Sequence, residues 1–270
     1  MTEAADASRG WVSPLRVGRS YFTRRRSVTG PAEGITASLD ALARPGVDTS
    51  RARPAVRAFF EQTASLELRV VSSWMWLFVP GAYFVRWLAW YVGQLRMPMR
   101  EARILTRAYC LDPAKDGREG ARGCIRTYGE EGPVMQVVSY AVTPGETPTL
   151  DAVFPGPIGK LVGRLRLDAV GEDDTGLWAV ALVSTGVSLS LLGVSIPLPF
   201  RERFALYAAD APSIPEDLAP RELPGATLLG EHRQWVFGIP FVRYHYWFRP
   251  VIPPAARSSG PVSRRSGPVR

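Results

Sequence analysis

The second half of the chain alternates apolar and polar positions with the period of β-strands. Short segments rich in Val, Leu and aromatic residues recur about every ten residues beyond Pro98, separated by turn clusters such as GEEGP and TPGETP. No helical period lies between these segments, so the strands should form an antiparallel sheet. The predicted strands cover residues 104–110, 124–129, 134–142, 149–154, 162–170, 177–185, 187–194, 203–209 and 232–250.

The last of these segments shows the alternation best. Within residues 242–249, Val, Tyr, Tyr and Phe alternate with Arg, His, Trp and Arg. One face of this strand should therefore be buried, while the other mixes charge with aromatic rings. The segments VSIPLPFRER and VFGIPFVRY share Ile-Pro followed by Phe and Arg, and this indicates matching bends at one rim of the sheet, because proline interrupts ladder hydrogen bonds.

Residues 54–70 carry a helical pattern followed by a strand pattern. Pro54 suits the first turn of a helix. The apolar face of that helix would carry Val56, Phe59, Phe60 and Thr63. LELRV at 66–70 then alternates as a half-buried strand does.

The stretch WMWLFVPGAYFVRWLAWYVGQL, residues 74–95, holds four of the eight tryptophans and one charge, Arg86. Crossing a bilayer takes about 20 apolar residues in uninterrupted helix. Pro80 and Gly81 divide the stretch, and Arg86 would lie in the hydrocarbon, so we expect no membrane span. A helix from Gly81 onward would be apolar on most sides. It is either buried under the sheet, which we favour, or lies in a membrane interface, where Trp and Tyr are enriched.

These patterns predict an α+β, β-rich fold. The expected architecture is a curved antiparallel sheet of about nine strands, an open barrel or a sandwich, capped by N-terminal helices. A single domain at 54–250 would contain the helical cap (54–97) and the sheet (100–250), and a chain of 270 residues, 46% of them apolar, is long enough to bury such a core.

The net charge of +8 lies at the two ends of the chain. Residues 1–53 hold nine Arg against five acidic residues, residues 251–270 hold four Arg and no acid, and the body holds twenty of each sign. We therefore predict disordered basic arms at both ends and no nucleic-acid binding by the neutral body. The first residues are acidic and lack the apolar run of a secretory signal, which indicates a cytoplasmic protein.

No motif identifies an activity. The sequence contains no P-loop, dinucleotide fingerprint, HExxH, CxxC pair or GxSxG elbow. With two histidines and two cysteines in the chain, we expect no metal and no cofactor. If the final segment folds back near Gly238, Glu231, His232 and His245 would come together as an acid–base group. Two ordinary sheet histidines are the interpretation we favour.

The function predicted from these features is binding of an apolar or lipid-like ligand, or peripheral membrane contact through 74–95. The alternative is an enzyme that acts on an apolar substrate with Glu231, His232 and His245 as its catalytic group, and a structural interaction domain is a third possibility. We predict that the helix around Trp87 and Trp90 covers the sheet and lines an apolar cavity. The expected ligand-binding residues are Trp87, Trp90, Trp235, Arg243, Tyr244, His245 and Tyr246.

Overall fold

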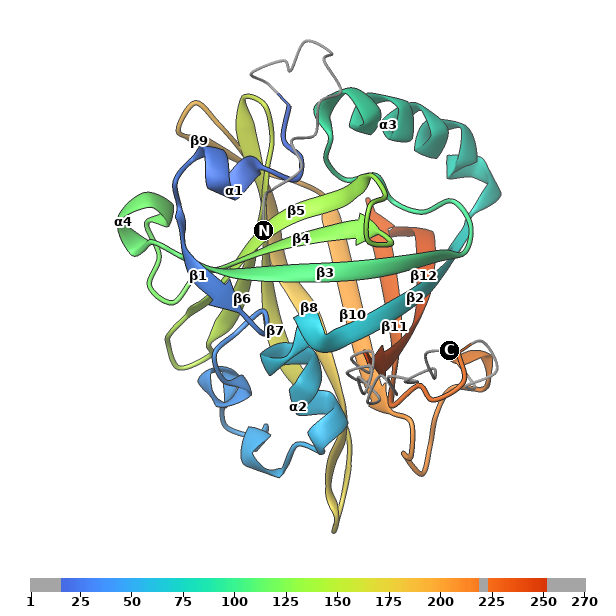
Figure 1. Ribbon diagram of the computed structural model, residues 1–270. Helices are drawn as coiled ribbons and strands as arrows, with labels where there is room; N and C mark the ends of the chain where they lie inside the picture. The colour runs from blue at the N-terminus through green and yellow to red at the C-terminus, as the bar shows by residue number, and fades with distance from the viewer. Residues whose placement is uncertain (1–15, 219–222, 252–270) are drawn as a thin grey trace, which may run out of the picture.

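The structure of the protein, a computed structural model, describes residues 16–218 and 223–251. In this part of the chain, twelve strands form one antiparallel sheet (Figure 1). The strands are β1 (Val28–Ala32), β2 (Leu66–Trp74), β3 (Ala102–Leu111), β4 (Arg122–Tyr128), β5 (Val134–Thr143), β6 (Thr149–Pro155), β7 (Gly159–Asp173), β8 (Gly176–Leu191), β9 (Val194–Pro197), β10 (Phe200–Ala208), β11 (Leu228–Val236) and β12 (Ile239–Pro250).

Ten of these strands close into an up-and-down barrel. Each barrel strand pairs with the next one along the chain, from β2 to β8 and then through β10, β11 and β12. The barrel closes where β12 pairs with β2, from Val242 opposite Trp74 to Pro250 opposite Leu66. Strand β1 adds to β3 on the outside of this circuit, and β9 pairs with β8. Full closure leaves no open edge among the ten barrel strands.

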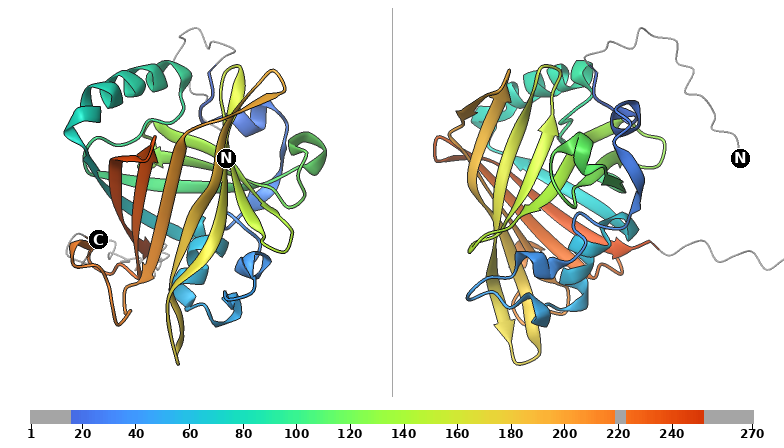
Figure 2. Two further views of the ribbon diagram at one scale, coloured as in Figure 1. Left: turned by 180° about the vertical axis from the view of Figure 1, so that it is seen from behind. Right: turned by 90° about the vertical axis from the view of Figure 1, so that its left-hand side faces the viewer.

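The helical segments lie at the two ends and along the sides of the barrel. They are α1 (Tyr21–Arg24), η1 (Leu39–Leu42), η2 (Thr49–Arg51), α2 (Pro54–Glu61), η3 (Thr63–Ser65), η4 (Trp76–Phe78), α3 (Val79–Val92), α4 (Pro113–Asp116) and η5 (Glu216–Leu218). Both views of Figure 2 place α3 across one end of the barrel and α2 at the opposite end. The two ends of the barrel are therefore covered by different helices.

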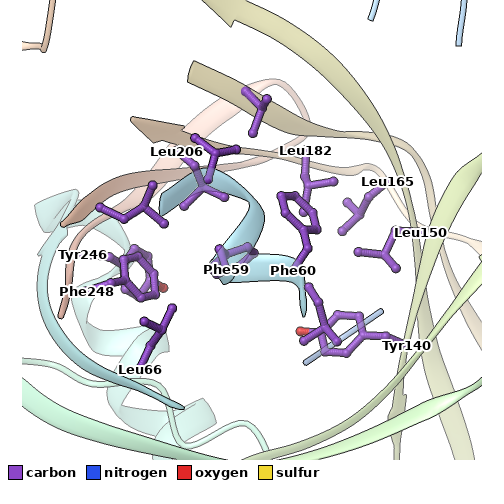
Figure 3. Packing of buried hydrophobic residues seen from close by; sticks show 14 of the residues in the cluster. Phe59, Phe60, Leu66, Tyr140, Leu150, Leu165, Leu182, Leu206, Tyr246 and Phe248 are labelled. Carbon is purple, nitrogen blue, oxygen red and sulfur yellow. The ribbon is translucent and has the colours of Figure 1, made fainter. Parts of the chain in front are cut away.

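The barrel interior is a packed core at the end near α2. Phe59 and Phe60 of α2 point in among leucines and tyrosines of the surrounding strands (Figure 3). The Phe59 ring lies 5.4 Å from the rings of Phe204 and Phe248. Pro54 begins α2 as predicted, because its fixed φ and missing N–H suit the first helical turn.

The β-rich prediction is confirmed, but the sheet is a closed barrel and not an open sheet or sandwich capped by helices. The strand expected at 66–70 inside the helical cap extends to Trp74 as β2 and closes the barrel between β3 and β12. This pairing joins opposite ends of the chain, and local periodicity carries no signal for it. The strands expected at 177–185 and 187–194 are one strand, β8, which pairs along most of β7.

Residues 16–53, predicted as part of a disordered arm, are instead ordered against the barrel. β1 pairs with β3, and Ile35, Leu39 and Leu42 are buried in the same cluster as Phe60. Local periodicity gives no indication of these contacts, because the burial of residues 16–53 depends on the barrel beside them. Residues 1–15 and 252–270 lie outside the described residues, so disorder there stays a prediction.

Candidate functional site

Helix α3 is held over its end of the barrel by the segment that follows it. The helix ends at Gly93, whose φ of 69° is in the left-handed region that glycine adopts without strain. The Gln94 amide donates to the carbonyls of Val137 (2.6 Å) and Pro155 (3.1 Å), and the backbone N–H of Arg96 donates to Met135 (2.7 Å). The C-terminal end of α3 is thus fixed to β5 and β6.

An apolar pocket of about 370 Å³ lies between α3 and the mouth of the barrel. Its walls come from the inner side of α3, the segment after it, and the ends of β2, β10, β11 and β12. The lining residues are Trp74, Phe78, Gly81, Ala82, Phe84, Val85, Arg86, Leu95, Met97, Met99, Phe200, Val236 and Phe241. Arg86 is the one charged residue among them, and its guanidinium donates to the Met97 carbonyl at 3.0 Å.

The outer face of α3 is exposed, which contradicts the burial that we favoured from the sequence. Only the small residues Ala82 and Ala89 are buried within the helix, while Trp87 and Trp90 are 55% and 60% exposed. The other exposed large apolar residues of η4 and α3 are Trp76, Leu77, Tyr83, Phe84, Val85, Leu88 and Tyr91. The narrow stripe of small residues lets the helix approach the barrel closely, so most of the large side chains project outward.

Exposed apolar residues also occur on other connections at this end of the barrel. Leu192, on the β8–β9 turn, is 96% exposed, and Phe237, on the β11–β12 turn, is 78% exposed. Ile158, between β6 and β7, is also largely exposed. Within the described residues, no helix has the length and apolar character needed to cross a bilayer.

The structure places the predicted ligand-binding residues in different parts of the barrel. Tyr244 and Tyr246 are buried in the barrel core. Trp87 and Trp90 lie on the exposed face of α3, and Trp235 of β11 does not line the pocket. The remaining two, Arg243 and His245, lie on the outer face of the barrel. The set therefore does not form one binding site.

The two histidines lie on opposite faces of the β11–β12 hairpin. In the ladder, His232 lies opposite Tyr244 and Glu231 lies opposite His245. Inside the barrel, His232 Nε2 lies 2.8 Å from the Glu202 carboxylate, which also accepts a hydrogen bond from the Gln234 amide. Burial alone would raise the pKa of Glu202, but the bonds and charge of His232 and the Gln234 amide outweigh it and lower that pKa.

The outer-face group is an ion-pair network. Glu231, which is almost fully buried, pairs with Arg243, and Arg243 also pairs with Asp217 of η5 at 2.5 Å. Burial and the Arg243 charge lower the pKa of His245 despite the nearby carboxylates. Asp217, Glu231 and His245 bring their ligand atoms within 4.8 Å of one another, the spacing of a metal site. Because Arg243 and Arg233 already pair with these carboxylates, we assign the group a structural role.

Sequence reasoning missed most of the pocket. Trp74, Phe200, Val236 and Phe241 line it from strand ends, where local alternation gives no indication of the rim. One signal was present: the repeated Ile-Pro before Phe, expected to mark bends at one rim, precedes Phe200 and Phe241. Both rings are in contact at the pocket, with centroids 5.5 Å apart.

The chain has a distant sequence similarity to a protein that is described as a membrane protein. No family model and no solved structure matches it. The chain is similar to a protein of Bacillus subtilis (strain 168) described as "Uncharacterized membrane protein YndJ", with 22% identity over 244 residues. This similarity covers 83% of the chain and 40% of the relative, so the chain spans less than half of the length of that membrane protein.

Proposed function

We propose that this chain is a peripheral lipid-binding domain. The α3 end of the barrel rests on a bilayer surface, and the pocket beneath α3 receives the apolar part of a lipid-like molecule. The observation that carries the proposal is the exposed aromatic face of α3 directly over an apolar pocket. The similarity to a protein described as a membrane protein agrees with this placement.

The exposed face of α3 supports docking on lipid. Large contiguous apolar patches are rare on proteins that remain free in water, and they mark interaction surfaces. Trp and Tyr are the residues enriched where proteins meet the membrane interface, and α3 exposes Trp87, Trp90, Tyr83 and Tyr91. The exposed Leu192 and Phe237 lie on the β8–β9 and β11–β12 turns and add apolar surface outside α3.

The pocket supports binding of an apolar ligand. Ligand sites usually have volumes of roughly 300 to 1,000 Å³ and mostly apolar walls. The mouth pocket, at about 370 Å³, is at the small end of this range. It suits one hydrocarbon chain or a compact hydrophobe better than a whole phospholipid.

Flotation with phosphatidylcholine vesicles tests docking. The unchanged chain should float with the vesicles, and its tryptophan emission should shift to shorter wavelength as the indoles leave water. A double variant, Trp87→Ser with Trp90→Ser, should lose most of this binding, whereas Val170→Ser, at an exposed apolar site on β7, should keep it. A folded chain that ignores the vesicles would refute docking and leave the pocket to be tested separately.

The enzyme alternative has less support. Glu231 pairs with Arg243 and does not orient either histidine as a base. His232 and His245 face different sides of the sheet, so they do not act on one substrate. We therefore do not adopt the enzyme alternative.

A further inference from the structure

Three polar side chains occupy neighbouring positions on the inner face of β2 and β12. Trp74 lines the pocket, and Ser72 lies two residues deeper on the same face of β2. Tyr244 lies opposite Ser72 in the β2–β12 ladder, and its ring meets the Trp74 ring edge-on with centroids 6.2 Å apart. The Trp74 indole nitrogen and the hydroxyls of Ser72 and Tyr244 are buried and have no hydrogen-bond partner among the described residues.

Such a group of atoms is a candidate site for a hydrogen-bonding ligand. Buried side-chain donors in folded proteins are almost always hydrogen-bonded. Here three donors occupy neighbouring positions on one face, and one of them belongs to a pocket-lining residue. A polar atom that enters through the pocket reaches this group first at Trp74.

The surroundings of Tyr244 favour an uncharged partner. Burial and the neighbouring Tyr246 and Tyr128 hydroxyls raise the pKa of Tyr244, and no cation offsets them. Burial also raises the pKa of Tyr246, but there the buried Arg126 guanidinium acts in the opposite direction. On its other side, Tyr244 meets the His232 ring at 6.0 Å, with the Glu202 carboxylate behind it. An anion beside Tyr244 would be buried without a counter-charge.

We propose that the ligand of the mouth pocket carries an uncharged hydrogen-bond acceptor, a carbonyl or hydroxyl oxygen, that enters first and accepts from Ser72, Trp74 and Tyr244. Its hydrocarbon part then lies against Phe200, Phe241 and the inner side of α3. The inference rests on the proposed function, because it defines the ligand class of the same pocket. It also sets the orientation, with the polar end toward the barrel and the chain toward α3.

Competition against a neutral fluorescent hydrophobe, N-phenyl-1-naphthylamine, tests the inference with matched eight-carbon probes. The probes are octane, octan-1-ol, 2-octanone and octanoate. An apolar pocket without donors favours octane, since a buried carbonyl without a partner is unfavourable. We expect 2-octanone and octan-1-ol to compete at least as well as octane, and octanoate to compete poorly.

Single-donor variants make the test specific. Ser72→Ala and Tyr244→Phe should each lower the ratio of 2-octanone to octane affinity by about threefold to tenfold, the effect of one hydrogen bond. Trp74→Phe should act likewise. Trp178→Phe is the matched control, since its buried indole nitrogen also has no partner among the described residues but lies on β8 beside Gly171, outside the pocket.

Each outcome either supports or overturns the proposed ligand class. Because Tyr244→Phe removes an unpartnered hydroxyl, the variant should fold with an undiminished melting temperature. An unchanged ratio of 2-octanone to octane affinity in all three variants would overturn the inference and leave the pocket function standing. Octanoate as the tightest probe would overturn it in favour of an anionic head group near Arg86. If no probe displaces the fluorophore, both the inference and the pocket function are wrong.

Discussion

His232 Nε2 lies 2.8 Å from Glu202 Oε2 within the barrel, on strands that are neighbours in the sheet but thirty residues apart in the sequence. The pair packs among aromatic rings, with Phe204 5.4 Å and Tyr244 6.0 Å from the imidazole. A carboxylate in such surroundings needs its hydrogen bonds to remain ionised. The pair therefore affects the stability of the fold and the dependence of that stability on pH.

Glu202→Gln should reduce the acid sensitivity of the fold. The pKa of Glu202 is lowered in the folded state from a reference of 4.5, so its ionisation stabilises the fold above that pH. This contribution is lost as the pH falls through the folded-state pKa. In urea unfolding, Glu202→Gln should be about 1–2 kcal/mol less stable than the unchanged chain at pH 7, and the difference should shrink below pH 4.5. A difference that widens in acid would contradict this prediction.

Gly81→Leu should separate the pocket from the docking face. A Cβ at Gly81 meets no atom within 4 Å, and Gly81 lines the pocket, so a leucine adds bulk at the pocket wall without a steric clash of its Cβ. Binding of a fluorescent hydrophobe should fall at least about tenfold, since the added side chain takes part of a small pocket. Vesicle flotation should be unchanged, because the exposed face of α3 is untouched. Equal loss of both activities would mean that pocket and membrane face act as one.

Trp87→Ala and Phe59→Ala should differ in their effect on stability. Trp87 is more than half exposed, so its removal should change the free energy of unfolding by no more than about 0.5 kcal/mol. Phe59 is buried at the centre of the core, and its truncation should cost about 3–5 kcal/mol. Chemical denaturation of both variants measures the contrast. A large destabilisation by Trp87→Ala would show that α3 is packed against something other than solvent.

Leu39→Ala tests whether residues 16–53 belong to the fold. Leu39 is fully buried in the main core cluster, and its backbone N–H donates to the Glu61 carboxylate at 2.8 Å. The substitution should lower the free energy of unfolding by about 2–5 kcal/mol. Ser38→Ala, next to it on the surface, is the control and should lose about 1 kcal/mol, since Ser38 accepts from the Asp40 N–H at the start of η1. A leucine in a disordered arm would tolerate the change without effect.

Much of the strand content could be predicted from the sequence. Alternation along residues 242–249 correctly separates the side chains that face the barrel core, such as Tyr244 and Phe248, from the outward Arg243, although Trp247 on the outer face is also buried. The turn clusters GEEGP and TPGETP mark the β4–β5 and β5–β6 connections. Most of the candidate site could not be predicted in this way. Phe78, Phe200 and Val236 meet beneath α3 from three different elements, and their proximity follows from closure of the barrel.

The sequence by itself determined where most of the barrel strands lie, because a period of two is a local property of each segment. It also predicted a helix from Gly81 onward, and the structure has a helix at Val79–Val92. Only the tertiary structure decided which way that helix faces. Ala82 and Ala89 pack inward because a closed barrel mouth needs a close-fitting cover, and most of the large aromatic side chains are thereby turned outward. Burial depends on what lies opposite a residue, and no pattern within one segment contains that information.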